Sequence, residues 1–181
     1  MQIEELEGGR VEEWSDGSRI DGRAAGATRR EGLYLGEWAT VADAEEAGLL
    51  LAWRDSDVVV LDSQGVIQRM ANLQYDKPSS WIEELLVRQM QERPRTLMWV
   101  RGHRGVQGNE MADKRARREV KKGRGTPVVA TPRGIKQEFP IYPRAPAHFG
   151  WSSAAVRGLV YMVTDKGPQQ QWSWEIGKVD T

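Results

Sequence analysis

The feature that most constrains the fold is an unbroken apolar run between two aspartates, Asp57-Val-Val-Val-Leu-Asp62. A short apolar run without polar interruption is typical of a strand that is buried on both faces, as strands in parallel sheets are. Such a strand needs helices packed against the sheet, so the run predicts an α/β layer architecture.

Four more strands are expected around this central one. Three precede it, near residues 10–16, 22–30 and 31–38, and the period-two alternation around Leu33 and Leu35 supports the third of them. The fourth covers residues 96–100, Thr-Leu-Met-Trp-Val. The sequence therefore predicts a mixed five-stranded sheet.

Residues that can cap the start of a helix lie between and after these strands. Thr40 begins one helix, with Asp43 as its capping-box partner, and Ser63 can cap a second helix that runs to Met70. Ser80 begins a third helix, and a fourth comes after the Gly-rich loop 102–108, where Asn109 can act as the cap. The element order predicts helices on both faces of the sheet, in a domain over residues 10–122.

The two ends of the chain differ from this domain. Residues 1–9 form an acidic lead-in, and residues 123–181 form a basic, Pro-rich linker and C-terminal extension, since five of the eight prolines lie between Pro127 and Pro146. One amphipathic helix is expected over residues 151–163, with Trp151, Ala155 and Leu159 along one stripe. A single helix cannot bury its own apolar face, so it must pack on the domain or on another protein.

Composition excludes several classes of site. The chain has no cysteine and only two histidines, which excludes a disulfide framework, a Cys-based zinc finger and a thiol nucleophile. A bound metal must then be held mainly by oxygen, as Mg²⁺ or Mn²⁺ is. Apolar stretches fall far short of the roughly 20 residues of a membrane helix, and the acidic N-terminus does not fit a secretory signal. We therefore expect an intracellular protein with no membrane partner.

Charge is distributed unevenly along the neutral chain. Residues 1–50 contain 12 acidic and 5 basic residues, whereas residues 114–181 contain 5 acidic and 13 basic residues. Excess carboxylates can hold cations, and excess lysine and arginine can neutralise phosphates. Most of these side chains are expected to be solvated surface charge.

Four carboxylates stand where a site could form. Asp16 ends the first strand and Asp62 ends the buried one, and open α/β sheets form sites beyond the carboxyl ends of their strands. Glu45 lies in the first turn of a helix, and Asp113 lies in the helix after the Gly-rich loop. If the fold brings them together, they raise one another's pKa values, and divalent cations remove that cost. Two cations about 4 Å apart suit attack of water on a phosphodiester.

Each of the four acids also has a purely structural explanation. These are an Asp16-Gly17 turn, a helix N-terminal charge at Glu45, an Asx turn at Asp62 and an i,i+4 ion pair from Asp113 to Arg117. His103 is more specific, because a Gly-rich loop seldom fixes a buried structural histidine, whereas His148 lies among prolines and is expected at the surface. The ordered set, rather than any one residue, points to chemistry.

The ordered set resembles the motif series of type 1 ribonuclease H. The matching segments are Asp16-Gly-Ser, Asp43-Ala-Glu45, Leu61-Asp62-Ser63 and Trp99-Val-Arg-Gly-His103-Arg-Gly-Val-Gln-Gly-Asn109-Glu110-Met-Ala-Asp113. The resemblance covers about residues 10–122, and the tail is similar to the segment after this domain in fungal LINE-like (non-LTR) retrotransposon polyproteins. It implies a ribonuclease H-like fold and cleavage of the RNA strand of RNA–DNA hybrids, with two Mg²⁺ or Mn²⁺ ions.

The resemblance also implies roles for particular residues. Asp16 would bridge both metals, Asp62 and Asp113 would complete the metal shell, and Glu45 would bind the second metal on the substrate side. His103 would move protons or release product. The implied substrate contacts are Gly17, Ser18, Ser63, Asn109, Lys114, Arg115, Lys121 and Lys122.

Departures from the family pattern are visible. The first strand is unusually polar, Glu45 competes with the adjacent Glu46 for the metal role, and the basic handle of some bacterial members is absent, with only Lys77 in residues 71–80. The basic helix that carries Asp113 can replace the handle, or it can be a nuclear-import stretch or a solvated helix end. The expected partners are an RNA–DNA hybrid and the reverse transcriptase of the same polyprotein, in the nucleus. The alternatives are a non-cleaving nucleic-acid-binding module and a polyprotein-docking module of the same fold.

Overall fold

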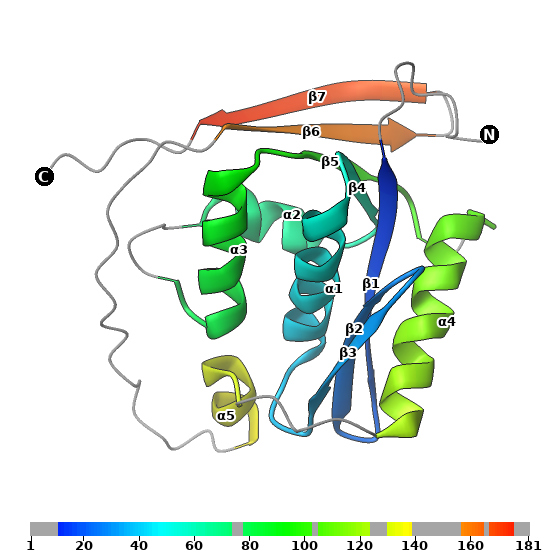
Figure 1. Ribbon diagram of the computed structural model, residues 1–181, viewed down its shortest axis with the longest axis vertical. Coiled ribbons are helices and arrows are strands. Elements are labelled where there is room, and N and C mark those ends of the chain that lie inside the picture. Colours follow the sequence, from blue (N-terminus) through cyan, green and yellow to red (C-terminus); the bar gives the residue numbers. More distant parts are fainter. Residues whose placement is uncertain are drawn as a thin grey trace, which may run out of the picture.

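The sheet lies at the centre of the molecule (Figure 1). The computed structural model describes residues 11–73, 78–102, 105–123, 130–138, 157–164 and 167–175. The strand order is β3-β2-β1-β4-β5-β6-β7. The strands are β1 (Glu12–Ile20), β2 (Arg23–Thr28), β3 (Gly32–Gly36), β4 (Val58–Leu61), β5 (Thr96–Trp99), β6 (Arg157–Thr164) and β7 (Gly167–Glu175).

Helices cover both faces of the first five strands, which confirms the predicted α/β fold. They are α1 (Val41–Asp55), α2 (Gln64–Ala71), α3 (Trp81–Glu92), α4 (Gln107–Lys122) and α5 (Pro132–Glu138). Figure 1 shows α1 and α3 on one side of the sheet and α4 on the other. Strands β1, β4 and β5 run parallel to one another, while β2 and β3 add an antiparallel meander to β1.

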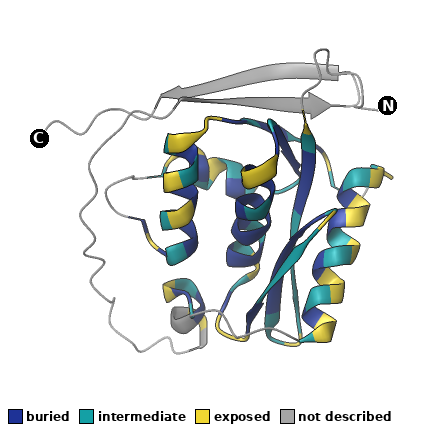
Figure 2. Cartoon of the chain, in the orientation of Figure 1, coloured by how far each residue is buried: buried dark blue, intermediate teal, exposed yellow. Residues whose placement is uncertain are grey.

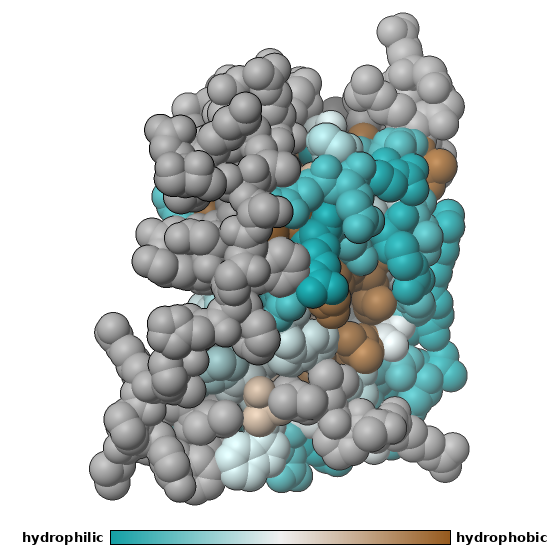
Figure 3. All heavy atoms as spheres, turned by 60° about the vertical axis from the view of Figure 1, so that its left-hand side comes forward, coloured by the Kyte–Doolittle hydropathy of each residue, from teal (hydrophilic) through white to brown (hydrophobic). Residues whose placement is uncertain are grey.

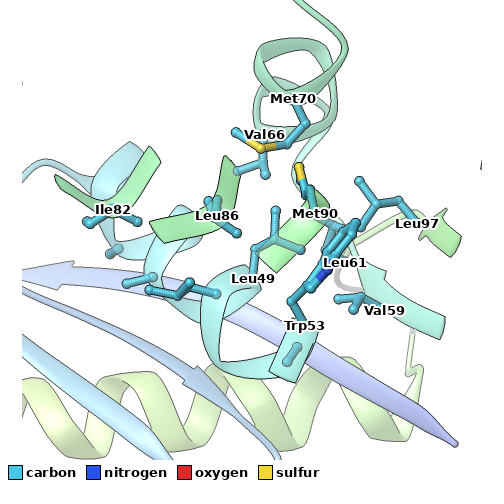
Figure 4. Packing of buried hydrophobic residues seen from close by; sticks show 14 of the residues in the cluster. Leu49, Trp53, Val59, Leu61, Val66, Met70, Ile82, Leu86, Met90 and Leu97 are labelled. Atoms are coloured by element: carbon cyan, nitrogen blue, oxygen red, sulfur yellow. The ribbon is translucent and has the colours of Figure 1, made fainter. Parts of the chain in front are cut away.

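Strand β4 is buried on both faces, as its apolar run predicts. Val58 and Val60 join a cluster with Trp14, Met98 and Ala112 beneath α4. Val59 and Leu61 point the other way, into a larger cluster formed by α1, α2 and α3. Figure 4 shows that larger cluster, with side chains such as Leu49, Trp53, Leu86 and Met90 meeting between the helices and the sheet.

The predicted caps form at three helix starts. Thr40 Oγ1 accepts from the Asp43 N–H (3.2 Å), and the Thr40 N–H donates to the Asp43 carboxylate (2.7 Å), so the capping box of α1 is complete. Ser63 Oγ accepts from the Val66 N–H at the start of α2, and Ser80 Oγ accepts from the Glu83 N–H at the start of α3. These local bonds fix where each helix leaves the sheet.

Helix α1 packs unusually close to the sheet. Figure 2 shows the middle of the helix mostly buried between the strands and α3, with exposed residues at its ends. A Cβ on Gly48 would lie 2.5 Å from the Asp16 carbonyl oxygen, and one on Gly26 would lie 2.3 Å from the Ala44 carbonyl oxygen. Glycine is therefore required at both positions, because the helix backbone rests directly on β1 and β2.

The polar residues of the first strand are accommodated by ion pairs. Glu13 is buried, and its carboxylate is paired with Arg29 (3.0 Å) and Arg30 (3.1 Å) across the sheet edge. Trp14, on the other face, is 3% exposed and packs under α4. Successive residues of β1 thus face two different environments: Glu13 faces arginines, and Trp14 faces the apolar cluster beneath α4.

Four expectations about single elements are wrong. The first strand does not end at Asp16, and Asp16-Gly17 is not a turn, because β1 continues to Ile20 and Gly17 pairs with Gly26 of β2. The helix expected over residues 151–163 is replaced from Arg157 onward by β6, which pairs in parallel with β5 and antiparallel with β7. The spacing of its apolar residues suits either structure, and the open edge of β5 supplies the hydrogen-bond partners that select the strand.

The other two concern the ends of elements. A linker was expected after residue 122, whereas Pro132–Glu138 forms α5. Asn109 does not cap α4, because the helix begins at Gln107 and Val106 is the N-cap residue without a side-chain hydrogen bond. Asn109 lies inside the first turn of α4.

One face of the described part of the molecule is mainly hydrophilic. Figure 3 shows this face, where polar side chains dominate and a smaller hydrophobic area is exposed near the middle. Among the described residues, no helix combines the length and the apolar character that crossing a membrane requires.

Candidate active site

Asp16 and Asp62 lie level with each other on neighbouring parallel strands. The register pairs Trp14 of β1 with Val60 of β4, so two residues further along Asp16 stands beside Asp62, which comes directly after β4. Both carboxylates are therefore at the carboxyl-end side of the parallel strands, where α/β sheets form sites.

Glu45 reaches this edge because α1 touches the sheet through its backbone. A Cβ on Gly17 would lie 2.2 Å from the Glu45 nitrogen, so the first turn of α1 lies directly over the residue after Asp16. Ser63 Oγ donates to Glu45 Oε2 (2.7 Å), and Arg69 Nη2 lies 3.7 Å from the same oxygen. The side chain is thus held between β1 and the start of α2.

Helix α4 brings the fourth carboxylate and an amide. The ring of Trp14 leaves no space for a Cβ on Gly108, which would approach it to 2.3 Å, so the first turn of α4 sits on this tryptophan. Asn109 Nδ2 then donates to Asp62 Oδ2 (2.9 Å). Asp113 lies one turn later on the same helix and pairs with Arg117 (2.7 Å).

The electrostatics of Asp16 show that the four carboxylates share one neighbourhood. Burial, followed by the charge of Asp62, raises the pKa of Asp16 to about 7, with further contributions from Asp113 and Glu45. The Gly17 N–H, which donates to the carboxylate (2.7 Å), works in the opposite direction. Without a counter-ion, Asp16 therefore keeps its proton to a much higher pH than an ordinary aspartate does.

The pKa of Glu45 is also raised, although some of its neighbours oppose the rise. Burial is the largest cause that raises its pKa, and the charge of Asp62 adds to it. The hydrogen bond from Ser63 and the charge of Arg69 oppose the rise. Both Asp16 and Glu45 thus lie where negative charge is costly, as carboxylates at functional sites commonly do.

The chemistry of these donors fits a hard divalent cation. Carboxylate oxygens are the ligands that Mg²⁺ and Mn²⁺ prefer, and a cation would relieve the repulsion at Asp16. Within the described part of the chain, no three Asp, Glu or His side chains are already arranged to hold an ion. Each acid instead turns to a nearby partner, such as Asn109, Ser63 or Arg117, so binding requires the side chains to rotate toward one another.

The structure distinguishes Glu45 from its neighbour Glu46. Glu46 is completely buried on the other side of α1, where Arg69 (2.6 Å) and Arg133 (2.5 Å) bind its carboxylate. Glu45 therefore belongs to the Asp16 side of the helix and Glu46 to the core side. His103 lies outside the described residues.

The residues expected to contact substrate divide into two groups. Gly17, Ser18, Ser63 and Asn109 lie at or beside the carboxylates, with Gly17 required for helix packing and Asn109 bound to Asp62. The basic residues lie along α4, where Lys114 approaches Glu110 (3.8 Å), Arg115 binds the Arg30 carbonyl oxygen, Lys122 pairs with Glu119 (2.8 Å) and Lys121 is exposed.

Two arginines near the site were not anticipated from the sequence. Arg69 lies in α2 and contacts both Glu45 and Glu46, and Arg133 lies in α5. The i,i+3 and i,i+4 rules that identify pairs on one helix cannot detect them, because their partners are 23 or more residues away in sequence.

One protein-family model matches part of the chain. Residues 51–121 match the family model of RNase H. The RNase H match begins in the last part of α1, includes Asp62 and Asp113, and ends just before the end of α4. Asp16 and Glu45 precede it, and the structure places them beside the matched region. No curated protein shows significant similarity to the chain.

Proposed function

We propose that this protein hydrolyses the RNA strand of RNA–DNA hybrids, as a metal-dependent ribonuclease H. The observation that carries the proposal is the convergence of four carboxylates from separate parts of the chain: Asp62, Asp113 and Glu45 lie close enough to Asp16 that each raises its pKa. A binding module has no use for such a cluster, since it lowers stability unless a cation neutralises it. The family match over residues 51–121 supports the same reaction class.

In this proposal the four carboxylates hold two Mg²⁺ or Mn²⁺ ions. When bound, two such ions activate the attacking water and stabilise the leaving oxygen of the phosphodiester. Asn109 binds one oxygen of Asp62 and Ser63 binds one oxygen of Glu45, and each hydrogen bond can persist while the other oxygen turns toward a cation. His103 moves protons or assists product release from the loop before α4.

Hybrid binding is proposed along the basic part of α4. Lys121 lies eight residues after Asp113, which at 1.5 Å per residue places it about 12 Å further along the helix axis. That distance spans three to four phosphates of one strand at about 3.4 Å each. At about 100° per residue, Lys121 lies about 80° around the helix from Asp113 and can neutralise a phosphate a few positions from the scissile bond. Lys122 lies about 180° around the helix from Asp113 and pairs with Glu119, so it would contact the hybrid only from the edge of this surface. Recognition would depend on 2′-hydroxyls and groove shape rather than on base sequence.

The biological setting is a further part of the proposal. The resemblance of the tail to fungal LINE-like retrotransposon polyproteins suggests a role in reverse transcription, with the adjoining reverse transcriptase as partner and the nucleus as location. The alternative is a module of the same fold that binds hybrid or docks to the polyprotein without cutting. The observation on the side of this alternative is that Asn109 and Arg117 bind Asp62 and Asp113, so these two carboxylates have protein partners without a metal.

A labelled RNA–DNA hybrid, incubated with and without Mg²⁺ or Mn²⁺, separates these two functions. We expect cutting of the RNA strand only with metal, leaving a 3′-hydroxyl and a 5′-phosphate. Asp62→Asn should abolish cutting and leave hybrid binding near the wild-type level, because the amide cannot replace an anionic ligand. Asp57→Asn is the matched control, since Asp57 lies at the opposite end of the same strand and pairs with Arg95. Full turnover by Asp62→Asn would exclude the metal mechanism.

A further inference from the structure

The segment before and within α5 is fastened to the start of α1. The Thr131 N–H donates to the Trp38 carbonyl oxygen (3.1 Å), and Thr131 Oγ1 donates to the buried Asp43 carboxylate (2.7 Å). A Cβ on Gly134 would lie 1.9 Å from the Trp38 carbonyl oxygen, so the two backbones are in direct contact. This segment lies beyond the region that matches RNase H, which ends at residue 121.

Arg133 holds three buried carboxylates at once. Its guanidinium donates to both oxygens of Glu46 (3.0 and 2.5 Å) and to Glu83 (2.9 Å), and it lies 3.3 Å from Asp43. The side chains of Asp43 and Glu46 are 0% exposed. Buried carboxylates without a cation are strongly destabilising, so these three depend on Arg133, which shares Glu46 with Arg69.

A second arginine joins this cluster to the candidate active site. Glu46 Oε1, which accepts from Arg133, also accepts from Arg69 Nε (2.6 Å). Nη2 of the Arg69 guanidinium lies 3.7 Å from Glu45 Oε2. A continuous chain of charges therefore runs from Arg133 through Glu46 and Arg69 to Glu45.

We propose that Arg133 is a positioning residue that sets the orientation of Glu45 through the shared contacts of Glu46 and Arg69. As long as Arg133 satisfies one side of Glu46, Arg69 donates to Glu46 through Nε alone, and its Nη2 faces Glu45 as an ion-pair partner at 3.7 Å rather than as a hydrogen-bond donor. Without Arg133, both oxygens of Glu46 turn to Arg69, which leaves Glu45. The metal-binding consequence rests on the proposed function, because it treats Glu45 as a ligand.

A double-mutant cycle in EDTA tests the chain of charges without any metal. Urea unfolding is measured for the wild type, Arg133→Gln, Glu45→Gln and the double variant. The two substitutions should be non-additive by about threefold or more in the unfolding equilibrium constant, as groups within one network are. Arg95→Gln with Glu45→Gln is the control cycle, since Arg95 is also buried but pairs with Asp57 at the other end of the sheet. Additivity in the Arg133 cycle, or equal coupling in both cycles, would overturn the proposal.

Titration with Mn²⁺, followed by electron paramagnetic resonance, tests the consequence at the site. Arg133→Gln should weaken binding about tenfold, as loss of a group that orients a metal ligand does, and Arg133→Lys should recover part of it. If Arg133→Gln does not fold, Arg69→Gln removes the middle of the chain and should weaken binding equally. Wild-type affinity in the folded Arg133 variant, or in Arg69→Gln, would contradict the positioning role. A wild-type protein that binds no Mn²⁺ refutes the proposed function instead, and the cycle in EDTA still decides the role of Arg133.

Discussion

Replacing Asp16 with asparagine should stabilise the metal-free protein, and the gain should grow with pH. The folded-state pKa of Asp16 is raised to about 7 from an ordinary 3.8, so between these values the folded protein keeps a proton that the unfolded chain has released. Stability therefore falls as pH rises from about 4 to about 7, and the loss is complete above that range. Asparagine does not ionise and removes this loss.

The size of the effect can be worked out from the shift. About three pKa units correspond to about 4 kcal/mol at 1.36 kcal/mol each, and partial solvent screening of this half-buried group reduces the expected gain to about 2–4 kcal/mol. Urea unfolding of the wild type and Asp16→Asn in EDTA, at about pH 4.5 and about pH 8, measures it. The difference between the two proteins should be small at the lower pH and reach the full value at the higher pH.

Two further measurements make this test specific. Asp21→Asn removes one negative charge from an exposed turn with a positive φ, which asparagine tolerates, and so controls for net charge. Mg²⁺ should stabilise the wild type at the higher pH more than it stabilises Asp16→Asn, because only the wild type keeps the full carboxylate set. Parallel pH profiles for the wild type and Asp16→Asn would refute the argument that burial and neighbouring acids make this charge costly.

Packing and substrate binding give two more tests. Gly48→Ala places a Cβ 2.5 Å from the Asp16 carbonyl oxygen, so it should destabilise the protein by about 1–3 kcal/mol in urea unfolding. In the control variant Gly65→Ala, the new Cβ meets the flexible end of the Arg69 side chain at 3.3 Å, and the change should cost less than about 0.5 kcal/mol. Equal stability of the two variants would contradict the close contact between α1 and the sheet. Charge reversal at Lys121 and Lys122 should weaken hybrid binding and flatten its salt dependence, measured by fluorescence anisotropy across a salt series. An unchanged salt slope would exclude this part of α4 from the interface.

The local elements could be predicted because their signals are local. Thr40, Ser63 and Ser80 begin helices as their capping side chains indicate, and the apolar run after Asp57 forms a strand buried on both faces. The order of these elements was enough to predict strands β1 to β5 and the presence of helices on both of their faces, but not β6 and β7. The placement of Asp16 beside Asp62 results from the parallel pairing of β1 and β4.

Long-range charge pairing could not be predicted in the same way. Glu13 looked out of place in a strand because its partners, Arg29 and Arg30, come from the other side of a hairpin. Arg133 looked like linker charge because its three acidic partners are at least 50 residues away. Asn109 looked like a cap, yet the contact with Asp62 recruits it instead. In each case tertiary contacts outweigh the local preference of the residue.

The backbone contact between α1 and the sheet also separates two engineering problems. Since glycines, rather than bulky side chains, set how near the helix lies to β1 and β2, the opposite face of α1 can be redesigned without moving Glu45 relative to Asp16. Residues such as Leu49 and Trp53, with their partners on α3, are therefore suitable targets for raising thermal tolerance while the edge that carries Asp16 and Glu45 keeps its dimensions.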